Sequence, residues 1–450
     1  MNYYQNYHKH TSLSHRYNKD SSLVPMDYMN VMLPLAKEGI PQIYSTVEHG
    51  WQSNYFHIYN DLEAINKANA SENYKPIKFI FGTEAYWVDD RFAKDNANNH
   101  IILLAKNDNG RKKLNRAIYE SFKTGYYYKG RMDLDILLNL PKSDIFCTSA
   151  CIAFWSRYDL DHLDDVVLKL NDHFDDFYLE VQANNTDSQK RVNEHILDLH
   201  DRYNIPIIGA TDSHEITMAQ MDDREYLLKS NKINYPEEDG NYMDFPSYDT
   251  LVDRFKKQNV LSDEQITECL DNTNHILDFE DIVLDRSLKV PVAKQYRGLS
   301  QEERNEVLKQ IIIKEWNEQK GDINRAKLAE YKKENTHDLN EILSCGMADY
   351  FIDSYLTMKR GQELGGVLTD SGRGSAVSMY LNKLLRLTKV DKVNAPVTMY
   401  SERFLTASRI LESKTPPDID NNCNMREPFI EAQKEIIGDV VRLTFWHLVH

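Results

Sequence analysis

Residues 205–215 read IPIIGATDSHE, and this stretch indicates how the first half of the chain folds. A short apolar run bounded by polar residues is typical of a buried strand, and Asp212 and His214 follow it at i, i+2 spacing. Polar–apolar segments of helical period, such as 111–122 and 187–203, separate this run from its neighbours. The alternation predicts parallel βαβ units, in an α/β barrel or a doubly wound sheet. The other predicted strands are residues 4–10, 41–46, 77–88, 100–106, 144–150 and 177–182.

The composition is that of a folded, acidic chain. Its 450 residues are 41% hydrophobic, and 54 Lys and Arg face 70 Asp and Glu, for a net charge of −16. No run approaches the roughly 20 apolar residues of a membrane span, and five scattered cysteines argue against a disulfide framework. We therefore expect a soluble, cytoplasmic protein with no membrane partner. The charge argues against indiscriminate binding to phosphate backbones, but not against a nucleic-acid enzyme whose acidic residues hold metal ions.

Candidate metal ligands recur where the predicted strands end. His8 and His10 share one face of the first strand, although a lone H-x-H is more often a polar strand end with two surface histidines. In a parallel barrel the carboxyl ends of the strands converge on one mouth, so ligands contributed by five strands favour a metal site over chance. His100 opens its strand instead and fits this geometry less well. The other strand-end candidates are His49, Glu84, Cys151, Asp212 and His214.

Taken in order, HKHTSLS, VEHG, FGTEAYWVDD, HIILLAKN, TSACI, FYLEVQ and IIGATDSHE resemble the PHP (polymerase and histidinol phosphatase) domain. More narrowly, they resemble the PHP domain of the bacterial C-family DNA polymerase III α subunits. The resemblance implies a distorted (β/α)7 barrel, phosphoesterase chemistry and, in the polymerase context, a proofreading 3′→5′ exonuclease. It implies up to three ions, and this mixture of ligands suits Zn, Mn or Fe better than Mg alone. The implied metal ligands are His8, His10, Asp20, His49, Glu84, His100, Cys151, Asp212 and His214.

In the second half of the sequence, the alternation of predicted strands and helices gives way to mainly helical segments. A turn-rich patch near residue 235 leads to helical segments at 250–258 and 263–278, and a long, charged helical region covers 300–364. We place a domain boundary near residue 290. Residues 1–290 then form the PHP domain with a helical extension, and residues 291–450 form part of a polymerase palm.

Two further motifs, each weak alone, point to the same family. SGRGSA at 371–376 is a glycine turn that opens a predicted helix, and in PPDID the carboxylates of Asp418 and Asp420 share one face of a predicted strand. With GMADYFID and SERFL, their order resembles the palm of C-family polymerases, a polymerase β-like nucleotidyltransferase fold. The resemblance implies that Arg373, Gly374 and Ser375 bind a nucleotide triphosphate and that the two aspartates hold Mg. Many members carry a further carboxylate where this chain has Asn422.

The sequence ends about thirty residues after PPDID, so we expect a short or split C-family α subunit with too little palm to polymerise alone. Three hypotheses follow. The chain is a metal-dependent 3′→5′ exonuclease or phosphoesterase acting on DNA; it is half of a polymerase completed by a second polypeptide, using deoxynucleoside triphosphates; or it is a non-catalytic module that engages replisome proteins.

Overall fold

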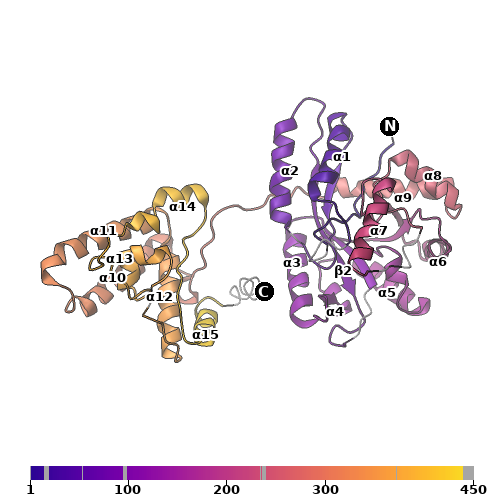
Figure 1. Ribbon diagram of the computed structural model, residues 1–450. Coiled ribbons are helices and arrows are strands. Elements are labelled where there is room, and N and C mark those ends of the chain that lie inside the picture. The colour runs from indigo at the N-terminus through magenta and orange to yellow at the C-terminus, as the bar shows by residue number, and fades with distance from the viewer. Residues whose placement is uncertain are drawn as a thin grey trace. The chain divides into compact units, whose positions relative to one another are not determined.

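The structure is a computed structural model that describes residues 2–14, 20–52, 54–94, 99–233, 235, 240–370 and 372–438. The chain divides into two compact units, Met1–Leu284 and Asp285–His450, shown in Figure 1. Each unit is described separately below. The final stretch of the sequence, from residue 439 on, lies outside the described residues.

In the described part of the first unit, seven strands form one mixed sheet in the order β1-β2-β3-β5-β6-β7, with β4 beside β2. The sheet curls into a half-barrel with helices on its outer side (Figure 1), which confirms the predicted α/β class. One expectation was wrong, because β3 runs antiparallel to both β2 and β5. The strands are β1 (Ile43–Thr46), β2 (Lys78–Trp87), β3 (Asn99–Ala105), β4 (Arg131–Met132), β5 (Ile145–Thr148), β6 (Asp176–Gln182) and β7 (Ile207–Ala210).

The predicted strand at residues 4–10 is extended chain rather than a ladder strand. It makes an isolated parallel bridge between Lys9 and Ser213, just past β7. Side chains take up much of its backbone hydrogen bonding, since Gln5 N donates to Thr273 Oγ1 and Ser45 Oγ donates to Tyr7 O. The segment therefore lies against the end of β7, where it carries His8 and His10 into the mouth of the curled sheet.

The helices of the first unit begin where the sequence supplies capping groups. Asn107 accepts from Gly110 N at the start of α3, and Thr186 accepts from Gln189 N at the start of α6. Leu163, Val166 and Leu199 of α5 and α6 pack in the largest core, against the outer face of the sheet. The helices are α1 (Pro25–Lys37), α2 (Tyr55–Asn69), α3 (Asp108–Thr124), α4 (Leu134–Leu137), α5 (Leu160–His173), α6 (Asp187–Tyr203), α7 (Met221–Ser230), α8 (Tyr248–Gln258) and α9 (Asp263–Asn272).

The second unit is helical in its described part. Its core joins α10, α11, α12, α13 and α14 around residues such as Phe351, Leu381 and Phe404. The predicted strand at PPDID is absent there: residues 414–422 are irregular, and the nearest pairing is an isolated bridge between Leu368 and Cys423. The helices are α10 (Gln301–Gln319), α11 (Leu328–Ser344), α12 (Ala348–Glu363), α13 (Tyr380–Leu384), α14 (Ala407–Ser413) and α15 (Glu427–Ile436).

Candidate metal centre

The structure brings all nine predicted metal ligands to one end of the curled sheet. His8 and His10 come from the N-terminal segment, and His49 follows β1 and bridges to Glu84 inside β2. His100 joins them because β3 is antiparallel to β2, so the start of β3 lies at the same rim, with His100 opposite Tyr86. The remaining members are Asp20, which precedes α1, Cys151, which follows β5, and Asp212 and His214, which follow β7.

Glu84 lies at the centre of four histidines. Its Oε1 lies 3.0 Å from His100 Nδ1 and 3.3 Å from His8 Nε2. Its Oε2 lies 2.6 Å from His49 Nδ1 and 3.3 Å from His10 Nε2. Asp212 Oδ1 lies 3.2 Å from Nε2 of both His8 and His10. Among the described residues, three groups of potential ligand atoms lie within 4.8 Å of one another: His10, His49 and His214; His8, His10 and Glu84; and His49, Glu84 and His100.

The hydrogen bonds behind His8 fix which of its nitrogens faces the cluster. His8 Nδ1 lies 2.8 Å from Glu180 Oε1, and because an ionised carboxylate only accepts, Nδ1 carries the proton. Nε2 of a neutral ring is then a bare acceptor directed at the oxygens of Glu84 and Asp212. An acceptor that faces acceptors needs a cation between them.

His10 is held in the same way. Its Nδ1 lies 3.0 Å from Ser14 Oγ, and because the Ser14 hydroxyl donates to Glu48, Ser14 accepts from His10. His10 Nε2 is therefore also bare toward Glu84 and Asp212. Within the described residues, four buried atoms of this cluster have no hydrogen-bond partner: His8 Nε2, His10 Nε2, Glu84 Oε2 and Asp212 Oδ1. Their chemistry fits metal ligation, in which such atoms bind a cation directly.

The pKa values of the clustered histidines and of Glu84 also indicate that the buried carboxylates of this centre favour a positive charge beside them. Burial opposes protonation of His10, but Asp212 and Glu84 outweigh it and raise its pKa to about 10. Burial and the neighbouring His10 lower the pKa of His49 to about 4. Burial would raise the pKa of Glu84, but the surrounding histidines hold it well below its usual range. The centre thus binds protons where a metal ion would otherwise supply the charge.

Asp20 and Cys151 complete the cluster from opposite sides. Arg224 Nη2 lies 2.6 Å from Asp20 Oδ1, while Asp20 Oδ2 lies 3.2 Å from His214 Nε2. Cys151 Sγ lies 3.6 Å from His100 Nδ1, and burial raises the pKa of the thiol. Cys147, to which the sequence assigned no function, packs in the outer apolar core. Asp212 has φ of 47°, a left-handed conformation that Asp adopts more readily than most residues.

The second candidate site consists of the glycine turn and the PPDID segment, and the structure brings Gly374 of the first against Asp420 of the second. Residues 367–369 pair with 422–424 through Thr369 N to Asn422 O and Asn424 N to Val367 O. This pairing brings Asp420 against Gly374: a Cβ added at Gly374 would lie 2.6 Å from Asp420 Oδ2. The helix expected after the glycine turn is a single 3-10 turn, Ser375–Ser378, because Met379 is extended. The half-buried Ile419 packs toward the core, which leaves the carboxylates flanking it exposed.

Comparison with known families separates the same two regions. Residues 7–184 match the PHP domain, and residues 305–442 match the bacterial DNA polymerase III alpha NTPase domain. The chain is 33% identical over 129 residues to the DNA polymerase III subunit alpha of Aquifex aeolicus (strain VF5), and 40% identical over 82 residues to that of Borreliella burgdorferi. Both parts of the chain therefore resemble bacterial DNA polymerase III alpha subunits. These matches cover 26% and 17% of this chain, and 10% and 7% of the relatives.

The two matched regions contain most of the candidate residues. The PHP match contains seven of the nine metal-ligand candidates, and Asp212 and His214 lie beyond it. The second match contains the glycine turn and both aspartates of PPDID. Among the described residues of this polymerase III alpha relative, no helix is long and apolar enough to cross a membrane.

Sequence reasoning missed the carboxylates behind the histidines. Glu180 accepts from His8 and from the Tyr7 hydroxyl, and Glu48 binds Thr11 and Ser14. Both are buried, and the signal for Glu180 was available, because a carboxylate in an apolar strand needs a partner. Arg224 carried no such signal, since it lies in α7, far from Asp20 in sequence.

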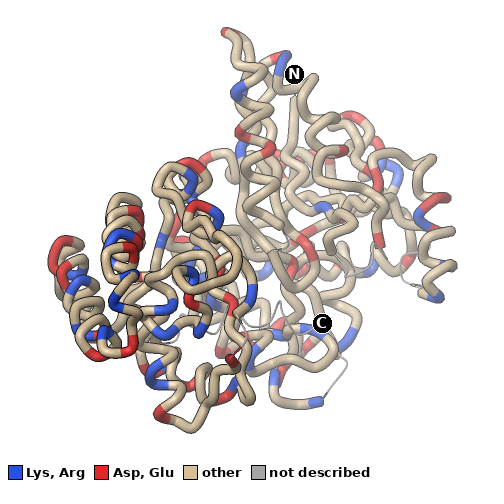
Figure 2. Tube along the Cα trace, turned by 60° about the vertical axis from the view of Figure 1, so that its left-hand side comes forward, with Lys and Arg blue, Asp and Glu red and all other residues tan. Residues whose placement is uncertain are grey.

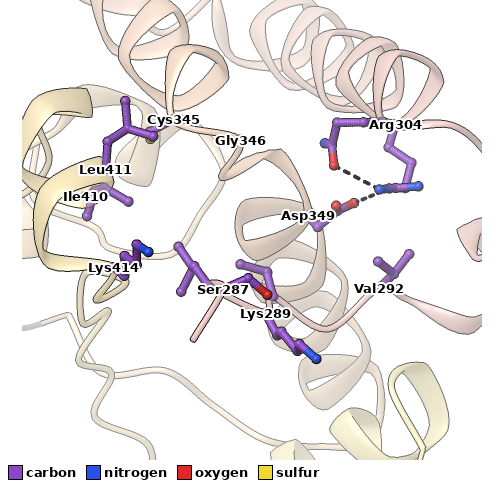
Figure 3. Close-up of a pocket in the computed structure, with 13 residues that line it drawn as sticks. Ser287, Lys289, Val292, Arg304, Cys345, Gly346, Asp349, Ile410, Leu411 and Lys414 are labelled. Carbon is purple, nitrogen blue, oxygen red and sulfur yellow. Dashed lines mark hydrogen bonds and ion pairs between the residues drawn. The ribbon is translucent and has the colours of Figure 1, made fainter. Parts of the chain in front are cut away.

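A cavity of about 640 Å³ in the second unit contains none of the candidate residues. Figure 3 shows its wall, where Arg304 Nε lies 2.8 Å from Asp349 Oδ1 and Arg304 Nη2 lies 2.9 Å from Gln301 Oε1. Figure 2 shows Lys and Arg interspersed with Asp and Glu along both units. Among the described residues, the groups of three or more potential metal ligands all lie in the first unit, and none of their members lines this cavity.

Proposed function

We propose that the cluster of the first unit hydrolyses phosphodiester bonds at the 3′ ends of DNA, as a metal-dependent 3′→5′ exonuclease. The observation that carries the proposal is the set of buried atoms on His8, His10, Glu84 and Asp212 that face one another and have no hydrogen-bond partner among the described residues. DNA is proposed as the substrate because the relatives are polymerase subunits.

The residues of this chain have separate tasks in the proposed reaction. Zn, Mn or Fe, when bound, would supply hydroxide at neutral pH and offset charge on the phosphate. Glu180 keeps the proton of His8 on Nδ1, and Ser14 with Glu48 does the same for His10, so that both Nε2 atoms stay available as ligands. Arg224 holds one oxygen of Asp20 and leaves the other directed at His214.

The test is metal analysis of the purified chain, paired with release of nucleotides from 3′-labelled DNA. We expect bound metal and activity in the native chain, and loss of both in His8→Ala/His10→Ala with the circular dichroism spectrum unchanged. Cys151→Ser should lose part of the metal, whereas Cys147→Ser, a buried thiol in the apolar core, should keep it. Full activity in the double histidine variant would contradict the proposal.

A second candidate function is nucleotidyl transfer in the second unit. The contact between Gly374 and Asp420 supports it, because that contact brings the carboxylate of Asp420 beside a glycine turn. Arg373, Gly374 and Ser375 would meet the triphosphate of a nucleotide, and Asp418 and Asp420 would share Mg with its phosphates.

Primer extension with Mg²⁺ and four deoxynucleotides tests the second function. We expect no extension by this chain alone, because among the described residues no group of three or more potential metal ligands includes Asp418 or Asp420. Extension that appears when a second polymerase polypeptide is added and vanishes in Asp418→Ala would support a split polymerase. Metal binding without either activity would favour a module that engages replisome proteins.

A further inference from the structure

An exposed aromatic and basic segment lies beside the candidate metal centre. Residues 125–131 read GYYYKGR, between α3 and β4. The side chains of Tyr126 and Tyr128 are 56% and 75% exposed, whereas Tyr127 between them is half-buried. Single exposed aromatic residues are common on protein surfaces, so the position and the backbone of this segment decide whether it has a function. We call Tyr126, Tyr128 and Lys129 the tyrosine rim.

Lys129 connects this rim to the metal cluster. Its Nζ lies 3.9 Å from the centre of the Tyr86 ring. The Tyr86 ring in turn lies 6.0 Å from His49 and 5.4 Å from His100 between ring centres. His100 is 17% exposed, whereas His8 and His10 are fully buried. The rim therefore borders His100, a solvent-accessible member of the cluster, where a substrate can enter.

The backbone of the rim is held in place at some cost. Arg131, 1% exposed, donates through Nε to Gly125 O and through Nη2 to Arg91 O and Ala93 O. Tyr128 has φ of 60°, a left-handed conformation that is unfavourable for a bulky residue and easy for glycine. A strained, exposed tyrosine on a fixed loop indicates a role for its ring that outweighs its conformational cost.

We propose that the tyrosine rim binds the single-stranded 3′ end of a DNA substrate, with bases stacked on Tyr126 and Tyr128 and a backbone phosphate beside Lys129. Aromatic rings interleaved with a cation are the usual platform for single strands, because every base has a face that can stack. This inference rests on the proposed nuclease function and adds a preference for unpaired ends. The local cations matter because the chain as a whole carries −16.

The charge near Lys129 supports a phosphate contact. Burial lowers the pKa of Lys129 to about 8, with Arg157 acting in the same direction and Asp20 and Glu84 opposing it. The side chain of Lys129 is therefore protonated at neutral pH. The exposed Arg157 supplies a second positive charge that acts on it. The half-buried ammonium of Lys129 has lost part of its hydration. A bound phosphate would restore hydrogen bonds and charge compensation to it, which favours the complex over the free protein.

The first experiment measures binding of a 5′-fluorescein dT12 with phosphorothioate linkages, which resist cleavage, to the full chain. Tyr126→Ala/Tyr128→Ala should weaken binding roughly 100-fold or more, because each of the two stacked bases contributes about a factor of ten or more. Tyr203→Ala is the matched control: Tyr203 is a 41% exposed tyrosine at the end of α6, before β7. It should bind dT12 as the native chain does.

Two further variants separate stacking from folding and from charge. Tyr128→Gly removes the ring but suits φ of 60°, so it should lose affinity while keeping or gaining thermal stability. Lys129→Met should weaken binding to dT12 and to an abasic 12-mer alike. It should also reduce the slope of log K against log salt concentration by about 1, the contribution of one phosphate contact. The tyrosine variants should leave binding of the abasic 12-mer unchanged.

Hydrolysis of bis(p-nitrophenyl) phosphate distinguishes this inference from the proposed function. The tyrosine variants should lose more activity on single-stranded DNA than on this small diester, which carries no nucleobase to stack. If the native chain hydrolyses no diester, the nuclease proposal fails, while the dT12 measurement still decides the role of the rim. Unchanged dT12 binding in Tyr126→Ala/Tyr128→Ala, or tighter native binding to a blunt duplex than to dT12, would overturn the inference.

Discussion

The two candidate sites of this chain differ in how far the protein itself completes them. In the first unit nine potential ligands converge, and the central ones, His8, His10 and Glu84, are fully buried. In the second unit Asp418 and Asp420 are both exposed, and Asp420 lies against Gly374 of the glycine turn. A site that is already built selects and retains metal ions. A site of two carboxylates needs the phosphates of a substrate to complete the coordination of Mg.

Metal removal should give the largest difference between the two sites. Dialysis against a chelator should lower 3′-nuclease activity by roughly a thousandfold or more, because the proposed chemistry depends on the ion. It should also lower the melting temperature of the first unit, because every group of three or more potential metal ligands among the described residues lies there. Calorimetry should show little change in the second unit, and an equal shift in both units would contradict this comparison.

Replacing a carboxylate behind the ligands tests whether the first site is held ready for metal. Glu180→Gln should weaken metal affinity roughly 10- to 100-fold, because Gln no longer holds the proton of His8 on Nδ1 by charge. Asp164→Asn is the matched control, since Asp164 pairs with His195 at 2.7 Å between α5 and α6. Competition with a chromogenic chelator measures both, and equal losses would remove the special role of Glu180.

In the second unit the corresponding test is steric. Gly374→Ala combines φ of 67° with a Cβ 2.6 Å from Asp420 Oδ2, so it should destabilise the unit by about 1–2 kcal/mol and displace the carboxylate. Gly365→Ala is the control, with φ of 93° but nothing within 4 Å of the added Cβ. Mg-dependent binding of a deoxynucleoside triphosphate should fall only in Gly374→Ala, and nuclease activity should change in neither.

The smallest expected effect is the pH dependence of the metal-free chain. The pKa of His10 in the folded chain is about 10, against about 6.5 unfolded. Its stabilising proton is therefore fully present below pH 6.5 and is lost as the pH rises toward 10. His49, with a pKa of about 4, acts in the opposite sense below pH 6.5. Lys9 and Lys129, whose pKa values burial lowers to about 7 and about 8, act against this loss above pH 7. The melting temperature of the metal-free chain should therefore fall from pH 7 to pH 10 relative to that of the metal-bound chain, in which the metal replaces the proton of His10.

Several parts of the fold followed from local pattern. The apolar runs at 177–182 and 205–211 became β6 and β7, and the helix predicted at 187–203 is α6 with those bounds. Capping residues and strict hydrophobic periodicity are local properties, so the sequence alone carries them. The strand predicted at PPDID failed because a strand needs a neighbour, and among the described residues only the bridge of Leu368 with Cys423 forms nearby.

The sequence by itself determined which residue types are available for chemistry and which strand ends carry them, because i, i+2 spacing and strand boundaries are local. Only the tertiary structure decided that His100 belongs to the cluster, since that depends on β3 running antiparallel to β2. The same holds for Glu180 behind His8, Arg224 beside Asp20 and Asp420 against Gly374. These contacts join residues that are 46 to 204 positions apart (420 − 374 = 46), and no local pattern encodes which distant groups meet when the cores pack.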